Sequence, residues 1–170
     1  GVLTGKRISG IAANGNTIVV AAANDDSQGA RGGGIYRSTD GGATFARVGG
    51  ALPAGSAYDL VRDPVSTNVL YTGIAFAHLS GGTSGVYRSA DMGATWTKVS
   101  STAMDAHVAA SQSISNIEMA VGRTGEVYAA FLVQGRLAGL YRSPDGTTSW
   151  TQLDSPATNE NGTNVGLNPR

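Results

Sequence analysis

The sequence predicts an all-β protein built from about three similar units, and three observations support this fold class. Among its 170 residues, 25 are glycines scattered between β-branched and aromatic runs without a three-residue period, as expected for short strands joined by tight turns. A ten-residue phrase, YRSTDGGATF at 36–45, returns as YRSADMGATW at 87–96. Pairs of short apolar runs precede both copies, so each unit contains several strands.

The repeated phrase has a third, altered copy, SPDGTTSW, at 143–150. The aspartates of the three copies, Asp40, Asp91 and Asp145, are spaced roughly fifty residues apart, which indicates a structural repeat. We call the three stretches 38–45, 89–96 and 143–150 the first, second and third box.

Each repeat is expected to contain four strands. Two apolar runs separated by a turn precede the box, a third strand enters the box, and a fourth leaves it. The expected strands are 8–14, 17–22, 34–37 and 45–48; 58–63, 68–73, 85–88 and 96–99; and 114–121, 126–133, 139–142 and 150–153. Four antiparallel strands form one propeller blade. The sequence therefore predicts a β-propeller segment of about three four-stranded antiparallel blades, at approximately 8–48, 57–99 and 113–153, with a tail at 154–170.

The boxes themselves are interpreted as turns between the third and fourth strands. Aspartate accepts hydrogen bonds from nearby backbone N–H groups, glycine permits positive φ, and serine and threonine add local bonds. A binding or catalytic site is the competing interpretation, but these residue types favour a structural turn that each blade needs once. The residues assigned this structural role are Ser38, Asp40, Gly42, Thr44, Phe45, Ser89, Asp91, Gly93, Thr95, Trp96, Ser143, Asp145 and Trp150.

The third box departs from the other two. Thr147 stands in the glycine position and Ser149 in the threonine position, so we expect this turn to be reshaped and to use Gly146 instead. The aromatic residue that ends each box is expected to be buried between sheets and to contribute to folding.

Composition excludes several classes of function. Twelve Lys and Arg balance twelve Asp and Glu, and no basic cluster is present, so we expect no nucleic-acid partner. The longest apolar stretches, such as 17–23, are far shorter than the roughly 20 residues of a membrane span. Two histidines and no cysteines provide no zinc-binding spacing, so no metal or cofactor is predicted, and His78 and His107 are interpreted as surface residues.

The box pattern Ser-x-Asp-x-Gly-x-Thr-Trp resembles the Asp-box, or BNR repeat, of propellers in sialidases, xyloglucan-degrading glycoside hydrolases, sortilin-type receptors and a photosystem assembly factor. The stretch 63–73, with Asp-Pro followed by Val-x-Tyr-x-Gly, is similar to a phrase of xyloglucanase-like and sortilin-like blades. This resemblance implies an exported, extracellular or periplasmic protein with a glycoside-hydrolase-like parent, whose loops bind carbohydrate or glycoconjugate. The alternative is a non-enzymatic scaffold that binds a protein partner.

The same resemblance implies where a site would lie. In these propellers the boxes are on the face opposite the active site, which here corresponds to the loops 24–33, 49–56, 77–85, 100–113 and 134–138. Asp25 and Asp26 follow the second strand where a sialidase-like acid/base loop would be, and they are the catalytic candidates. The substrate-binding candidates are Arg7, Arg31, His78 and Arg136. Phe76 is the only aromatic residue near these loops, which favours a scaffold or distant catalysis over an extended glycan cleft.

Three blades cannot close a propeller, because rings contain roughly 4–8 blades and each blade covers the faces of its neighbours. The remaining blades must come from a longer parent chain, from a second copy, or from another polypeptide, and the first of these is preferred.

Overall fold

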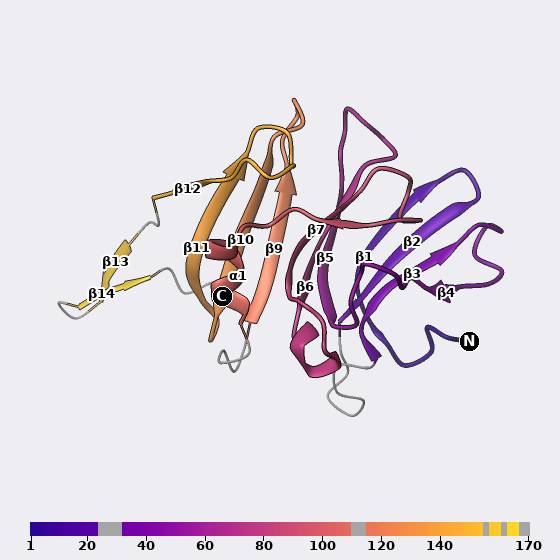
Figure 1. Cartoon of the computed structure of the whole chain (residues 1–170), viewed down its shortest axis with the longest axis horizontal. Helices are drawn as coiled ribbons and strands as arrows, with labels where there is room; N and C mark the ends of the chain where they lie inside the picture. Colours follow the sequence, from indigo (N-terminus) through magenta and orange to yellow (C-terminus); the bar gives the residue numbers. More distant parts are fainter. Residues whose placement is uncertain (24–31, 110–114, 155–156, 161–162, 167–170) are drawn as a thin grey trace.

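The computed structural model describes residues 1–23, 32–109, 115–154, 157–160 and 163–166 (Figure 1). It contains three four-stranded antiparallel sheets in chain order, which confirms the predicted fold class. The first sheet consists of β1 (Arg7–Asn14), β2 (Thr17–Ala23), β3 (Gly34–Ser38) and β4 (Ala46–Arg47). The second consists of β5 (Ser56–Arg62), β6 (Leu70–Ala75), β7 (Gly85–Ser89) and β8 (Thr97–Lys98). The third consists of β9 (Ser115–Val121), β10 (Val127–Val133), β11 (Arg136–Ser143) and β12 (Thr151–Leu153).

Within each sheet, strands that follow one another in the chain are antiparallel neighbours, and the sheets lie side by side, with β5 in contact with both β1 and β9 (Figure 1). The fourth strands are shorter than expected: β4 and β8 have two residues each and begin after the aromatic residue of the box. They pair with one neighbour only, so their outer backbone groups have no partner strand within the sheet.

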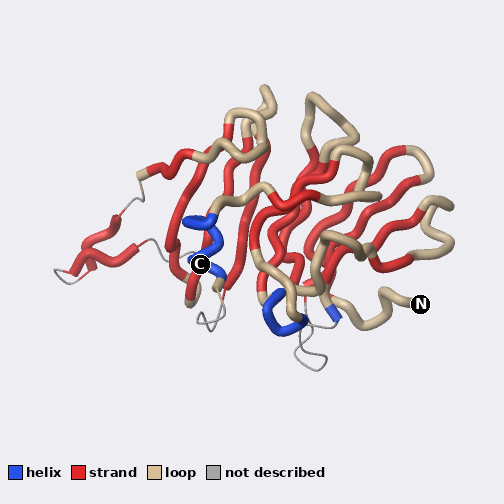
Figure 2. The backbone as a smooth tube through the Cα atoms, viewed as in Figure 1, coloured by secondary structure: helices blue, strands red, loops and turns tan. Residues whose placement is uncertain are grey.

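Several short elements were not anticipated. The 3₁₀ segment η2 (Ala77–Ser80) joins β6 to β7, and α1 (Thr102–Asp105) with η3 (Ala106–Val108) joins β8 to β9. In Figure 2 these helical segments lie in the lower half of the view, away from the third box. In the tail, β13 (Ala157–Glu160) pairs with β14 (Thr163–Gly166), and β14 contacts β11. Among the described residues no helix is long and apolar enough to cross a membrane.

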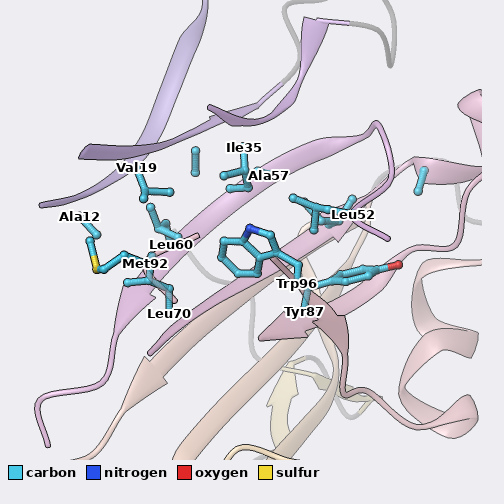
Figure 3. Packing of buried hydrophobic residues seen from close by; sticks show 13 residues of the cluster. Ala12, Val19, Ile35, Leu52, Ala57, Leu60, Leu70, Tyr87, Met92 and Trp96 are labelled. Carbon is cyan, nitrogen blue, oxygen red and sulfur yellow. The ribbon is translucent and has the colours of Figure 1, made fainter. Parts of the chain in front are cut away.

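Two hydrophobic cores lie between the sheets. Trp96 is at the centre of the core between the first and second sheets, where Val19 and Ile35 meet Leu70 and Met92 (Figure 3). Its side chain is 4% exposed, and its indole Nε1 donates to the carbonyl of Gly93 at 3.1 Å. The aromatic residue of the second box is therefore part of an inter-sheet core.

The core between the second and third sheets is built from larger side chains. Tyr71 and Val86 of the second sheet pack against Ile117, Phe131 and Tyr141 of the third. The rings of Phe131 and Tyr141 meet edge to face, with centroids 5.7 Å apart. Each sheet thus buries one face against the next, as blades do.

Close approach of neighbouring sheets depends on glycine at two points. A Cβ at Gly10 of β1 would lie 2.8 Å from Cβ of Leu60 in β5, and a Cβ at Gly73 of β6 would lie 2.5 Å from Cβ of Ile117 in β9. Both distances are shorter than side chains tolerate, so the sheet spacing at these two points requires a residue without a side chain.

Candidate functional site

The first two boxes form the same closed turn. In the first box, Asp40 Oδ1 accepts hydrogen bonds from the Ser38 hydroxyl at 2.6 Å and the Thr44 backbone N–H at 2.9 Å, while Oδ2 accepts from the Thr44 hydroxyl at 2.5 Å. The Gly42 N–H donates to the Ser38 hydroxyl at 2.9 Å. The second box repeats these contacts around Asp91. All these bonds join residues of one turn to each other.

The third box is reshaped around a nearer threonine. Asp145 Oδ1 accepts from the backbone N–H and the hydroxyl of Thr147, at 3.0 and 2.8 Å, and from Ser143 at 3.2 Å. The Gly146 N–H donates to the Ser143 hydroxyl at 3.0 Å, and Gly146 has a φ of 64°. The indole of Trp150 points out of the turn and donates to the carbonyl of Val99, the residue that follows β8, at 2.8 Å.

These hydrogen bonds make the box carboxyls stronger acids. The Ser38 hydroxyl, followed by Thr44, holds the pKa of Asp40 well below its ordinary value. Burial raises the pKa of Asp91, but hydrogen bonds from Thr95 and Ser89 outweigh it and leave the pKa lowered. The backbone N–H of Thr147 likewise lowers the pKa of Asp145. All three carboxyls therefore stay ionised as acceptors at neutral pH and are poorly suited to act as general acids.

Acid should weaken the fold through these carboxyls. A lowered folded-state pKa stabilises the native protein above the unfolded value of 3.8, and this contribution is lost as the pH falls through the folded-state pKa. We expect the free energy of unfolding, measured by urea titration at a series of pH values, to decrease below pH 3.8. Asp91→Asn should flatten this pH dependence. The matched variant Asp154→Asn, at an exposed position outside the boxes, should leave it unchanged, and equal slopes for both variants would contradict the assignment.

The end of the sheets opposite the boxes contains the candidate site. Because β7 begins after η2 and ends at the second box, the segments 76–84 and 99–109 lie at the other end of the second sheet from that box. We call this region, made of 76–84 and 99–109, the loop end.

Phe76 of the loop end contacts two other rings, and we call the three rings together the ring row. The Phe76 ring meets Tyr58 of β5 edge to face at a centroid distance of 6.4 Å, and the His78 ring lies at a centroid distance of 6.4 Å from Phe76. All three side chains are partly exposed. Tyr58 occupies an irregularity in the pairing of β5 with β6, between Ala57 and Asp59, which sets it apart from the regular ladder.

The backbone of Phe76 is strained. Phe76 has φ 58° and ψ 19°, the left-handed conformation that a bulky residue rarely adopts. A cost of about 1–3 kcal/mol is typical of such conformations, and they occur often at binding and catalytic sites. The structure therefore retains a large ring at a position where glycine or asparagine is easier to accommodate.

A pocket of about 300 Å³ continues from the ring of His78. It lies between η2 and the α1–η3 segment, so a loop of the second blade and the connection from the second to the third blade form its walls. The lining residues are His78, Gly82, Thr83, Ser84, Thr102, Asp105, Ala106, Val108 and Ala109. His78 Nδ1 is buried and has no hydrogen-bond partner among the residues that the structure describes. An apolar floor with a few polar groups is typical of small-ligand sites.

Asp105 holds one wall of the pocket in place. It forms an ion pair with Lys98 and accepts a hydrogen bond from Ser100 at 2.6 Å. Gly85 leaves the space for this cluster: it has a φ of 147°, and a Cβ there would collide with Ser100 and Asp105. Ser101 caps α1 by accepting from the Met104 N–H at 3.4 Å. A carboxylate with these partners is an oriented acceptor for ligand hydroxyl groups.

Tyr87 supports the other wall. Its hydroxyl donates to the carbonyl of Thr83 at 2.6 Å, and the Ser84 hydroxyl accepts from the Ala77 N–H at 3.1 Å. Burial, and secondarily the charge of Asp105, raises the pKa of Tyr87 to about 12, so its hydroxyl stays a donor at all physiological pH values.

Of the predicted site residues, only some lie among the described residues, and one of these lines the pocket. His78 lines the pocket. Arg7 begins β1 and Arg136 begins β11; both are exposed, and neither lines this pocket. The catalytic candidates Asp25 and Asp26, and the substrate-binding candidate Arg31, lie outside the described residues, so their roles stay predictions. Among the described residues no group of three histidine or acidic side chains gathers as metal ligands would.

His107 is not the surface residue that the sequence suggested. Its ring packs against Phe131 at 5.6 Å, and its Nε2 lies 2.9 Å from the Tyr141 hydroxyl. This partial burial lowers the pKa of His107 and favours the neutral ring. The prediction was wrong because the short segment η3, which holds His107 against the third sheet, was read as a loop.

The solved structures that resemble the chain include an ancestral GH74 enzyme and YCF48. An ancestral GH74 enzyme matches 87% of this chain and 20% of its own length, with 21% identity and a TM-score of 0.62. YCF48 bound to a D1 peptide matches 89% of this chain and 41% of its own length, with 15% identity and a TM-score of 0.52. No protein-family model matches the sequence, and a search of curated proteins found no match. At such identities the likeness shows the fold alone.

These likenesses and the three sheets together define the class of protein. The chain folds as a segment of a β-propeller with three consecutive four-stranded blades. It spans about a fifth of the GH74 enzyme and about two fifths of YCF48. The likeness therefore assigns no ligand and no activity to this chain.

Proposed function

We propose that this chain is a three-blade module of an exported, glycosidase-like propeller protein, and that its loop end binds neutral carbohydrate. The observation that carries the proposal is the row of Tyr58, Phe76 and His78 leading into the pocket beside Asp105. Ring faces suit the apolar face of a sugar, while hydroxyl and carboxylate groups suit its hydroxyls. The resemblance to a GH74 enzyme supports a glycosidase-like parent.

The lining favours an uncharged sugar over a sialylated one. A substrate carboxylate is best held by bidentate arginine, and neither Arg7 nor Arg136 lines the pocket. Asp105 would also repel an anionic sugar. The proposal therefore departs from the sialidase-like interpretation and assigns no hydrolytic step to the described residues. The boxes are proposed to be structural, and hydrolysis belongs elsewhere in the parent.

Binding should depend on the two carbon rings. Calorimetric titration with a neutral xyloglucan oligosaccharide is expected to show binding, and Tyr58→Ala or Phe76→Ala should each weaken it about tenfold or more, because a ring contact of about 1.4 kcal/mol is lost. Leu79→Ala is the matched control, since Leu79 belongs to η2 and is 62% exposed but is outside the ring row.

The competing outcomes are distinct. Sialyllactose should bind more weakly than the neutral oligosaccharide. Equal affinity of the ring variants and the unaltered chain would contradict the carbohydrate proposal, as would tighter binding of sialyllactose.

A protein-binding scaffold is the second candidate function, and one observation favours it: YCF48, whose structure resembles this chain, was solved with a bound peptide. Several pocket-lining residues are alanine, glycine or valine, which would also accept a peptide side chain. Binding of an unstructured peptide library, without binding of any oligosaccharide, would favour this function.

A further inference from the structure

The pocket beside His78 combines two kinds of surface in one small volume. Its floor is apolar, because the side chains of Ala106, Val108 and Ala109 are purely aliphatic. Its polar groups include the hydroxyl of Ser84 and the carboxylate of Asp105. At about 300 Å³ the pocket lies at the lower end of the range for small-molecule sites, so it suits one compact group of a ligand.

The Ser84 hydroxyl is available as a hydrogen-bond donor. Its oxygen accepts from the Ala77 backbone N–H at 3.1 Å, and the residue is 7% exposed. Among the residues that the structure describes, no group accepts the proton of this hydroxyl. Because a hydroxyl has one proton to donate and this one is unused, Ser84 offers a donor to a bound ligand.

Asp105 provides an acceptor close to this donor. A Cβ built at Gly85, the residue after Ser84, would lie 2.6 Å from Asp105 Oδ1. The Lys98 ammonium and the Ser100 hydroxyl each donate to one oxygen of the carboxylate, which leaves further lone pairs for a ligand N–H or O–H. A donor and an acceptor therefore lie at neighbouring positions in one pocket.

Of the groups that sugars carry, the acetamido group matches all three features. A ring hydroxyl can bond to Ser84 and Asp105, but it covers no apolar surface. An aliphatic group covers the floor but leaves the buried hydroxyl and the carboxylate without a partner, which weakens binding. A ligand carboxylate meets the negative charge of Asp105. An acetamido group has a methyl for the floor, an N–H for the carboxylate and a C=O for the hydroxyl.

We infer that the pocket holds the acetamido group of a neutral N-acetylated sugar, while Tyr58 and Phe76 contact the face of a sugar ring. This inference rests on the proposed carbohydrate function and narrows its ligand class to acetamido sugars. Asp105 accepts from the amide N–H, Ser84 donates to the amide oxygen, and the methyl lies on the segment 106–109. A neutral oligosaccharide without acetamido groups still binds through the ring contacts, but more weakly.

Two trisaccharides with the same β-linked glucose backbone test the inference. Triacetylchitotriose has an acetamido group on each ring where cellotriose has a hydroxyl. In calorimetric titration triacetylchitotriose is expected to bind about tenfold more tightly or better, because a site built for a polar group discriminates against a ligand that lacks it. Saturation-transfer NMR of triacetylchitotriose should give its strongest signal on the acetamido methyl. Equal affinities, or strongest saturation on the ring protons, would overturn the inference.

A substitution on the floor provides a second test. Ala106→Leu fills the space for the methyl, so triacetylchitotriose should lose its advantage while cellotriose binding stays the same. Ala103→Leu is the matched control, because Ala103 is an exposed alanine of the adjacent α1 and does not line the pocket. It should preserve the preference. Circular dichroism establishes that both variants are folded, and an undiminished preference in Ala106→Leu would contradict the inference.

Further outcomes separate this inference from the proposed function. Equal affinities for the two trisaccharides overturn the acetamido assignment alone. Failure of both trisaccharides and of the xyloglucan oligosaccharide to bind overturns the proposed function and this inference together. The peptide N-acetyl-trialanine has the same methyl and amide without a sugar ring, so it should bind more weakly than triacetylchitotriose. Tighter binding of this peptide would assign the pocket to a peptide and overturn the sugar assignment.

Discussion

Trp96→Ala is expected to lower the free energy of unfolding by about 3–5 kcal/mol. The protein loses the stabilisation from burying the indole, and the cavity left in the core adds a further cost. Trp96 is 4% exposed and lies between two sheets, where its loss would leave Val19, Leu60 and Met92 without a common neighbour. The hydrogen bond from its Nε1 to the Gly93 carbonyl would also be lost, so the turn of the second box would lose its bond to the buried indole. Urea denaturation followed by circular dichroism measures the change.

Trp150→Ala is the comparison for this variant. Trp150 ends the third box, but it is only partly buried against the second core, and its indole bonds to the carbonyl of Val99. We expect a smaller loss than for Trp96. A Trp96→Ala loss below about 1 kcal/mol, typical of exposed positions, would refute a structural role for the second box.

Gly73→Ala should also destabilise the protein strongly, by about 1–3 kcal/mol, because the added methyl overpacks the contact between the second and third sheets. Its Cβ would lie 2.5 Å from Cβ of Ile117 and 3.0 Å from the Ile117 carbonyl oxygen. Neither group is the flexible end of a long side chain, so the two sheets must separate to make room.

Gly49→Ala provides the control for this effect. Nothing lies within 4 Å of a Cβ built at Gly49, and its φ is not in the left-handed region. This variant should be neutral or slightly stabilising, since alanine restricts the unfolded chain. Equal urea midpoints for the two variants would show that sheet spacing does not depend on Gly73.

The fold was largely predictable because residues close together in the chain indicate each repeat. Alternating apolar runs and recurring turn residues predicted all three four-stranded sheets. The altered third box was expected to use Gly146, and in the structure that residue adopts the positive φ of its turn. These features depend on residues close together in the chain, which is why sequence reasoning could find them.

The candidate site was less predictable because it depends on irregularities. The sequence predicted Tyr58 as an ordinary strand residue. The pattern of apolar residues does not indicate the irregularity in strand pairing at Tyr58, nor the contact of its ring with Phe76. A positive φ at Phe76 has no sequence signal, since the residue is not glycine or asparagine. Ser101 was an available signal, because serine ahead of a short helical stretch is a typical N-cap.

The self-contained hydrogen bonding of the boxes bears on how such a chain can evolve. The aspartate side chain of each of the first two boxes is bonded within its own turn, and among the described residues the strand contacts between sheets join successive sheets, so stability is distributed much as in a one-dimensional array of coupled units. Duplicating or deleting one repeat then changes a single pair of contacts and leaves the interior of every other unit intact. The third box illustrates the resulting tolerance, since its altered threonine spacing is accommodated inside its own turn.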